Sequence, residues 1–319
     1  MAPQLNARTY VDLRTNKTSR IEIARGCKFK CPFCMLTGLK PYRELPFEVA
    51  RHLILTAPTK TVSLFAPDRM SYSRIDELEA VMRRAGKRGT GSDARLELLK
   101  RQTTVESVRF GVEGFSARTR KLMHKLPTNE LLLDGLLHVA ENLKTPKGAP
   151  LGSATVYMIS DLPGEGKEDL REFWDVLCAL DKRLKRKLTL FLSASSFAHS
   201  PYTPWARKAI NPWTTFNADF KATRPHFERL VIATRGGCIA APQRLAQMAT
   251  IRGDERVAPA LLWLATKGSR ILRSTEISDG ETVKSAITKT GFPAETLWKE
   301  LDESIELPWP PLTVSAKEA

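Results

Sequence analysis

The sequence has few cysteines for its length and no long apolar run. Its 319 residues include five cysteines, too few for the disulfide framework of a small secreted protein. No apolar stretch is long enough to span a membrane, and the start, "MAPQLNARTYVDLRTNK", lacks the apolar core of a signal peptide. Repeats and low-complexity tracts are also missing. We therefore expect a folded cytoplasmic protein that does not enter a membrane.

Acidic residues are scarce relative to basic ones. The chain has 35 Asp and Glu against 50 Lys and Arg, which gives a net charge of +15 and an isoelectric point near 9.7. An excess of this size favours a polyanionic partner, most simply nucleic acid or a nucleotide. Positive charge near an active site also attracts an acidic electron donor. Charge alone leaves both interpretations open.

Short apolar runs alternate with longer amphipathic segments through the first two thirds of the chain. Such alternation predicts an α/β fold with a parallel sheet covered by helices. Six strands indicate a partial (β/α)6 TIM-like barrel. They are predicted at Ser19–Gly26, Lys60–Asp68, Gly89–Leu98, Val105–Gly114, Ser153–Ser160 and Lys187–Phe197.

The pattern changes near Ala206. The segment "NPWTTFNADFKATRPHFERL" is aromatic and irregular, and two helices are predicted in "RLAQMATIRGDERVAPALLWLATKG". We therefore expect an N-terminal extension over residues 1–18, the partial barrel over 19–205, and a small, mainly helical extension over 206–319. The tail "ELPWPPLTVSAKEA" reads as extended or frayed.

The unusual segments all follow predicted strands. They are "GCKFKCPFC", "APDRM", "EGFS", "DLPGEG" and "AHSPYTP". In parallel α/β folds the loops after the strands carry the chemistry, so we expect these segments to meet at one face.

Three cysteines, Cys27, Cys31 and Cys34, fall within eight residues. Structural zinc sites use four ligands, commonly in two pairs far apart in sequence, and no second pair is present here. Cys178 is predicted on an outer helix, and Cys238 has no nearby partner. An iron–sulfur cluster held by three thiolates leaves one iron open to a substrate or cofactor. A partial zinc site in a nucleic-acid-binding module is the alternative.

The C-x3-C-x2-C spacing directly after a first strand resembles the radical S-adenosylmethionine (SAM) superfamily. This resemblance implies that the three cysteines hold a [4Fe–4S] cluster whose fourth iron binds SAM. It also implies reductive cleavage of SAM to a 5′-deoxyadenosyl radical, with electrons from a flavodoxin- or ferredoxin-type reductant. Lys28 and Lys30, inside the motif, are candidates for guiding a negatively charged partner to the cluster.

Later segments extend the resemblance to about residue 265. "FGVEGFSARTRKLMHK" and "VYMISDLPGEGKEDL" are similar to the branch that contains methylthiotransferases and cobalamin-type enzymes. The glycine pair usual after the second strand is replaced by "SLFAPD". The residues that the resemblance implies for cofactor binding are Phe33, Ala66, Pro67, Asp68, Ser92, Arg95, Glu113, Arg118 and Met158. His199 and Tyr202, before Thr203-Pro204, are candidates for substrate contact.

The sequence shows no cobalamin-binding domain, RNA-binding barrel or second cysteine cluster. We therefore expect a minimal radical SAM enzyme that abstracts hydrogen, after which the substrate rearranges or is modified. The charge favours a base in DNA, or another nucleic acid or nucleotide, as substrate. Modification of tRNA, or of a peptide or small metabolite, is the alternative.

Overall fold

Parallel strands form the centre of the computed structural model, which describes residues 10–11, 17–36, 41–89, 95–96, 99, 105, 107–125, 127–213, 216–235, 241–266 and 280–309. A first sheet contains β2 (Thr18–Glu22), β5 (Thr61–Phe65) and β6 (Arg88–Gly89), all parallel, with β1 (Tyr10–Val11) antiparallel at its edge. A second sheet contains β7 (Arg109–Glu113), β8 (Ser153–Ser160), β9 (Leu188–Ser196) and β10 (Leu230–Arg235), also all parallel. A short ribbon pairs β3 (Ala24–Arg25) with β4 (Arg43–Glu44).

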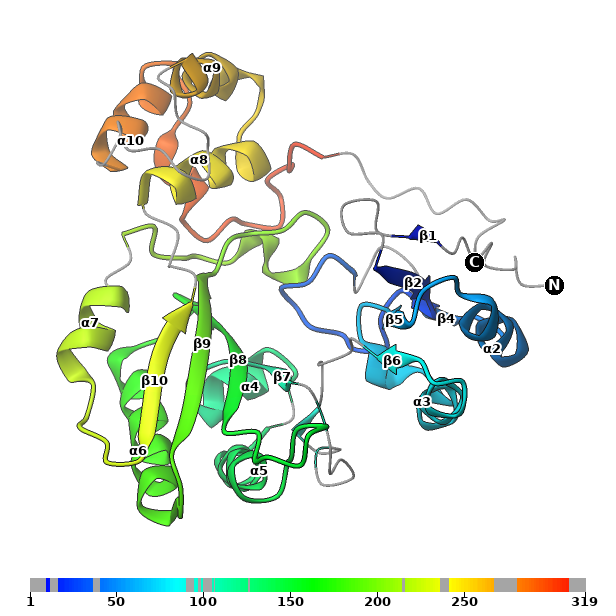
Figure 1. Cartoon of the computed structure of the whole chain (residues 1–319). Helices are drawn as coiled ribbons and strands as arrows, with labels where there is room; N and C mark the ends of the chain where they lie inside the picture. Colours follow the sequence, from blue (N-terminus) through cyan, green and yellow to red (C-terminus); the bar gives the residue numbers. More distant parts are fainter. Residues whose placement is uncertain are drawn as a thin grey trace.

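The parallel strands follow one another in chain order across the two sheets (Figure 1). Among the described residues no strand pairing joins β6 to β7, so no closed barrel is formed there. Sequential parallel strands with intervening helices confirm the α/β class and agree with a partial barrel. The strand expected at Gly89–Leu98 lies mostly outside the described residues, with β6 at its start.

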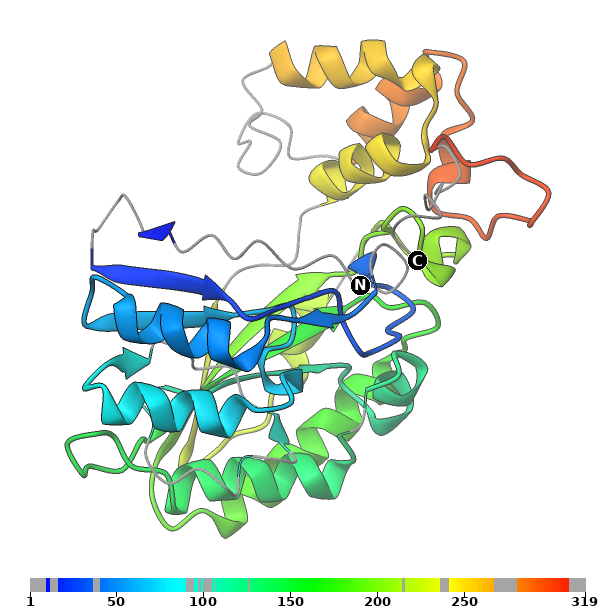
Figure 2. The ribbon, with the colours of Figure 1, turned by 90° about the vertical axis from the view of Figure 1, so that its right-hand side faces the viewer.

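Helices cover one face of each sheet. The first sheet packs against α2 (Phe47–Thr56) and α3 (Ile75–Arg84). The second packs against α5 (Asn129–Glu141), α6 (Lys167–Arg183) and α7 (Phe216–Thr223), with the short α4 (Ala117–Leu122) directly after β7. Figure 2 shows these helices stacked outside the strands.

Alternation within the strands explains this packing. Leu188, Leu190 and Leu192 of β9 are buried in one core with Phe173 and Trp174 of α6. Because successive side chains point to opposite faces of a sheet, the residues between these leucines face the other way. The inner face of the second sheet is therefore free to carry polar side chains.

Strand β10 was not predicted from the sequence. This strand lies parallel to β9, with Leu230 opposite Leu188 and Arg235 opposite Ser193. The sheet therefore continues past residue 205, where we expected a helical extension to begin. The run "LVIATR" is a short strand whose signal is hidden beside the irregular "KATRPHFE" segment.

The C-terminal helices form a separate layer above the carboxyl ends of β9 and β10 (Figure 1). They are α8 (Ala241–Arg252), α9 (Ala258–Thr266) and α10 (Gly280–Thr288), of which the first two match the predicted pair. Their core includes Phe197 and Trp205 from the segment after β9. No helix among the described residues is long and apolar enough to cross a membrane.

Candidate active site

A cavity of about 530 Å³ lies where the segments after the strands meet. Its wall combines the cysteine loop, the segment after β5, the inner face of β7 to β9 and the turn after α4. The volume is in the range of small-molecule and cofactor pockets. Three of the five segments expected to meet contribute to this wall, whereas residues 161–166 and 198–204 do not line it.

Ten of the residues named from the sequence line this cavity: Cys27, Cys31, Phe33, Cys34, Ala66, Pro67, Asp68, Arg95, Glu113 and Met158. They come from five separate stretches of the chain. Ser92 lies outside the described residues. Arg118, His199 and Tyr202 do not line the cavity.

The cysteine loop begins with a turn that requires glycine. Gly26 has φ 75°, a left-handed conformation that side chains disfavour, and it redirects the chain at Cys27. The amide of Cys34 donates to the carbonyl of Cys31 at 3.1 Å, which closes a second turn. Cys31 is buried, whereas Cys27 and Cys34 are partly exposed. Burial raises the pKa of the Cys31 thiol, and the charge of Lys125 works against this shift.

The donor set fits an iron–sulfur cluster. Three thiols line one cavity, and thiolates are the usual ligands of such clusters. In the part of the chain that the structure describes, no three His, Cys, Asp or Glu side chains converge as ligands of a single ion. The thiolates of a four-iron cluster bind different irons, so such a cluster does not need them to converge.

Lys28, the first residue between Cys27 and Cys31, is held from outside the loop. Its Nζ donates to the carbonyl oxygen of Ser71 at 2.8 Å and lies 3.4 Å from a carboxylate oxygen of Glu44. It also lies 4.5 Å from the ring centre of Tyr42. Lys28 is therefore engaged within the protein, where the sequence suggested a role in attracting a partner.

Glu44 is the centre of this contact. Its carboxylate accepts hydrogen bonds from the backbone amide and hydroxyl of Ser73 and from the hydroxyl of Tyr42. Burial opposes ionisation, but these hydrogen bonds outweigh it and hold the pKa of Glu44 below its usual value. The carboxylate therefore stays charged opposite Lys28.

Phe29, the second residue of the spacer, packs under Arg95. The guanidinium lies 4.8 Å from the ring centre of Phe29. Its Nη2 donates to Asp68 at 2.5 Å and to the Ser71 hydroxyl at 2.6 Å. Its Nε is buried and makes no hydrogen bond with a described residue. Arg95 thus retains one donor beside the cavity that a bound group can use.

Lys30, the third spacer residue, is held through its backbone. The Nδ1 atom of His124 lies 2.6 Å from the Lys30 carbonyl oxygen, so Nδ1 carries a proton and donates it. His124 has φ 56°, in the left-handed region, and follows α4. Each spacer residue is therefore fixed by a different part of the fold.

Glu113 ends β7 inside the cavity. It has φ 68° at an irregularity in the pairing of β7 with β8, and its carboxylate lies 3.5 Å from Lys125 Nζ. Burial raises the pKa of Glu113, and Lys125 acts in the opposite direction. A Cβ atom at Gly111 would collide with this carboxylate, so a side chain there would displace it. The family resemblance implied Glu113, whereas nothing indicated Lys125 as its partner.

The inner wall contains residues that sequence reasoning did not name. Arg109, Tyr157, Ser193 and Ser195 line the cavity from β7, β8 and β9. Arg109 and Tyr157 alternate with buried residues along their strands, for example Arg109 before Phe110. That alternation was a usable signal, because a polar residue on the inner face of a barrel strand points into the site.

Arg118 lies in the first turn of α4, outside the cavity wall. Its Nη2 donates to the buried carboxylate of Asp169 at 2.5 Å and to the Gly164 carbonyl at 2.9 Å. Asp169 also accepts from the Ser116 hydroxyl and the Gly166 amide. In this conformation Arg118 ties the segment after β7 to α6.

His199 and Tyr202 contact protein groups. His199 is buried, its Nε2 lies 2.8 Å from the Lys208 carbonyl, and burial lowers its pKa to about 3. Tyr202 has φ 59° and packs edge-on against Trp309, with ring centres 5.9 Å apart. The structure gives neither residue a place in the cavity wall.

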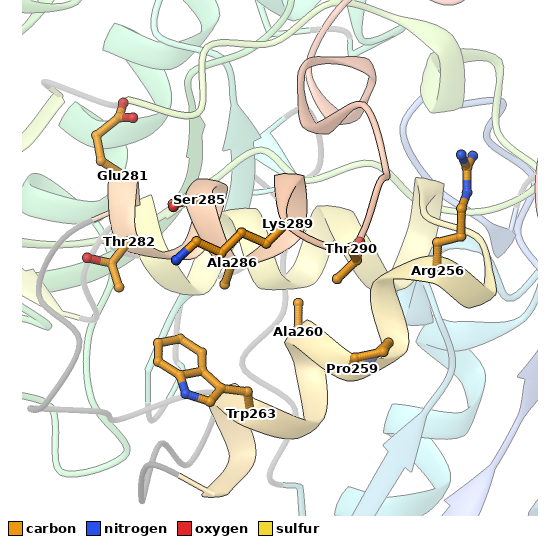
Figure 3. Close-up of a pocket in the computed structure, with 10 residues that line it drawn as sticks. All are labelled: Arg256, Pro259, Ala260, Trp263, Glu281, Thr282, Ser285, Ala286, Lys289 and Thr290. Atoms are coloured by element: carbon orange, nitrogen blue, oxygen red, sulfur yellow. The ribbon is translucent and has the colours of Figure 1, made fainter.

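A second hollow lies between α9 and α10. It measures about 980 Å³ and is lined by Arg256, Pro259, Ala260, Trp263, Glu281, Thr282, Ser285, Ala286, Lys289 and Thr290 (Figure 3). It has no thiol and is mainly apolar at its floor. None of the residues named from the sequence lines it.

Comparisons with known proteins identify part of the chain. Residues 21–177 match the family model of the radical SAM superfamily, which does not specify the branch. No curated protein matches the sequence significantly. Among solved structures, the crystal structure of Streptococcus suis SuiB matches at 15% identity and a TM-score of 0.39, over 67% of this chain and 48% of that chain. A likeness that low carries no argument. Residues 21–177 form a radical SAM domain, and members of this superfamily use a [4Fe–4S] cluster and SAM.

Proposed function

We propose that the enzyme abstracts a hydrogen atom from a base in DNA, or in another nucleic acid or nucleotide, and that the base is then rearranged or modified. The observation that carries this proposal is the net charge of +15. Positive charge of this size raises the local concentration of a polyanion and speeds its encounter with the protein.

The cavity supports the same substrate class. Four side chains of its lining are basic, Arg69, Arg95, Arg109 and Lys125, whereas two are acidic, Asp68 and Glu113. A cavity of about 530 Å³ is too small for a duplex. A base in DNA must therefore leave the stack, or come from a single strand, to reach the thiols.

We assign the cluster to Cys27, Cys31 and Cys34, and the SAM contacts to the predicted residues that line the same cavity. When bound, this group supplies reductive cleavage of SAM and a radical that abstracts hydrogen, with electrons from a flavodoxin- or ferredoxin-type donor. The protein's part is to fix the cysteine loop through Glu44, Arg95 and His124. Glu113 and Lys125 place a buried ion pair beside it.

The experiment that tests the substrate class measures binding at increasing salt. We expect the anaerobically prepared enzyme to bind single-stranded DNA, with an affinity that falls steeply as salt rises. Duplex DNA and tRNA are the comparison arms, and tighter binding of tRNA would assign RNA as the substrate. A flat salt response, or no retention at moderate salt, would overturn the proposal and favour a peptide or small metabolite.

Nucleoside mass spectrometry gives the matching test in cells. Digested DNA and RNA from cells with the parent enzyme should contain a nucleoside that is absent when Cys27→Ala replaces it. The same nucleosides in both cultures would count against base modification even if binding is strong.

A further inference from the structure

The inner face of the second sheet carries hydrogen-bonding groups that no described residue uses. We infer that this face is the substrate subsite, where Arg109 binds the phosphate of a nucleotide unit and Tyr157 stacks on its base. The inference rests on the proposed function, because it names the groups that would recognise such a substrate. It adds a place and an orientation for the substrate within the cavity.

Strand register places these residues side by side. Tyr157 of β8 lies between Gly111 of β7 and Ser193 of β9. Arg109 is opposite Thr155, two residues earlier along both strands. Gly111 has no side chain, and the carboxylate of Glu113 occupies the position that a side chain there would take. Tyr157 is 37% exposed, unusually open for an aromatic residue in a central strand. A flat ring can therefore lie against it.

Arg109 differs from the other cations of the cavity. Arg69 pairs with Glu79 at 2.6 Å, Arg95 with Asp68 at 2.5 Å, and Lys125 with Glu113 at 3.5 Å. Arg109 forms no hydrogen bond or ion pair with any described residue, although it lines the same wall. Its planar guanidinium presents paired donors that suit a phosphate.

Hydroxyl groups complete the wall. The side chains of Tyr157, Ser193 and Ser195 also have no hydrogen-bond partner within the described chain. An apolar pocket with a few convergent polar groups is the usual form of a small-molecule site. Unused donors and acceptors that converge on one cavity therefore point to a ligand that would use them.

The order of these groups along the sheet gives the orientation. Arg109 precedes Glu113 by four residues, which is about 13 Å along a strand, and Tyr157 lies between their levels. The Cys31 thiol is close enough to Glu113 and Lys125 to feel their charges, which places it toward the Glu113 end. A substrate with its phosphate on Arg109 and its base on Tyr157 would therefore direct the base toward the thiols.

The test compares nucleosides with their phosphates. Equilibrium dialysis of the full chain, prepared anaerobically, would use the four 2′-deoxynucleosides and their 5′-monophosphates. We expect at least one monophosphate to bind about tenfold or more tightly than its nucleoside, because a hydrogen-bonded charge pair is lost without the phosphate. Arg109→Gln should abolish that preference, and Arg109→Lys should restore part of it.

The aromatic part of the subsite has its own variants. Tyr157→Leu should weaken the nucleoside and the monophosphate alike, by about tenfold, whereas Tyr157→Phe should leave stacking in place. Arg84→Gln, which removes the same charge from an exposed helix end, is the matched control and should change neither ligand. Iron content and melting temperature of each variant show that the site is still assembled.

The outcomes separate this inference from the proposed function. If monophosphates bind but Arg109→Gln keeps the preference for phosphate, the subsite is wrong and the proposed substrate class survives. If Tyr157→Leu binds as the parent does, the stacking assignment fails. If no monophosphate binds while single-stranded DNA still binds in a salt-dependent way, the subsite fails and the proposed substrate class survives; if neither binds, both fail.

Discussion

The cysteine cavity and the hollow between α9 and α10 differ in size and in the chemical groups that line them. The hollow is the larger, at about 980 Å³ against about 530 Å³, yet its lining comes from the α9 and α10 region alone. The cavity draws residues from the first sheet, the second sheet and the loops between them. Figure 3 shows Trp263, Ala260 and Ala286 lining the hollow together with polar side chains such as Glu281 and Lys289, and no thiol.

This difference shows that the reactive side chains of this fold gather where segments from distant parts of the sequence meet. Two neighbouring helices bring together the side chains of two amphipathic faces, which are mainly apolar. Parallel strands end at one edge, so loops far apart in sequence place their functional groups in one volume. The four predictions below test whether function follows that convergence, from the largest expected effect to the smallest.

Loss of one thiol should have the largest effect. Cys31→Ala removes a ligand from the cavity, and we expect iron to fall from about four per chain to near none, with loss of SAM cleavage. Cys178→Ala, which removes a thiol from α6 outside the cavity, should keep both. Iron analysis and detection of 5′-deoxyadenosine measure the result. A Cys31→Ala protein that keeps its iron and its activity would show that the cavity is not the cluster site.

Loosening the cysteine loop should have an intermediate effect. Glu44→Gln removes the charge that faces Lys28 and weakens the contacts that hold the spacer of the motif. We expect a chelator to remove iron several-fold faster, while the melting temperature changes little. Glu48→Gln is the matched control, because its carboxylate is exposed and forms an ion pair with the neighbouring Arg51 at 3.2 Å. Equal iron loss from both variants would contradict the positioning role of Glu44.

The pH dependence of stability should expose a buried carboxyl near the second sheet. Burial raises the pKa of Glu165 to about 8 from its ordinary value of 4.5. The folded chain therefore holds this proton more tightly than the unfolded chain, so the free energy of unfolding falls as pH rises from about 4.5 to 8.

Glu165→Gln stays neutral and should remove that contribution. Between about pH 6 and pH 8.5 its melting temperature should fall less than that of the parent, because the parent loses the Glu165 proton over this range. Glu168→Gln, at an exposed position in the first turn of α6, should follow the parent curve. Parallel curves for all three proteins would contradict the raised pKa.

Changes in the larger hollow should have the smallest effect. Trp263→Ala removes an aromatic side chain that is already 38% exposed. We expect iron content and SAM cleavage to match the parent, with a small loss of thermal stability from reduced packing. The comparison would break down if this variant lost SAM cleavage while remaining folded, since the hollow would then belong to the site.

Local patterns predicted much of the fold. The strand expected at Ser153–Ser160 has those bounds in the structure, because its alternation is complete within eight residues. The cysteine loop was equally evident from its spacing. By contrast, β10 is short and follows irregular sequence, so only its pairing with β9 identifies it.

Long-range partners explain what the sequence could not predict about the site. Lys28 appeared free, but its partners Glu44 and Ser71 lie far along the chain and reach it only after folding. Arg118 resembled a cofactor ligand, yet Asp169 of α6 accepts its hydrogen bond. The alternation of buried and exposed residues in β7 and β8 marked Arg109 and Tyr157 as residues of the inner face. Cysteine spacing and motifs do not contain that information.

One backbone contact of the cysteine loop has a consequence for how the protein is handled. The amide of Trp205 donates to the carbonyl of Pro32 at 3.0 Å, and Phe33 packs near Trp205, with ring centres 6.2 Å apart. Trp205 belongs to the core of the C-terminal helices. A ligand that binds only the native loop stabilises every part that must be folded for the loop to form. Exposure to air, which strips iron from such sites, therefore removes a tie between the beginning of the domain and the C-terminal layer. Preparations that differ in iron content should therefore differ in how cooperatively they unfold.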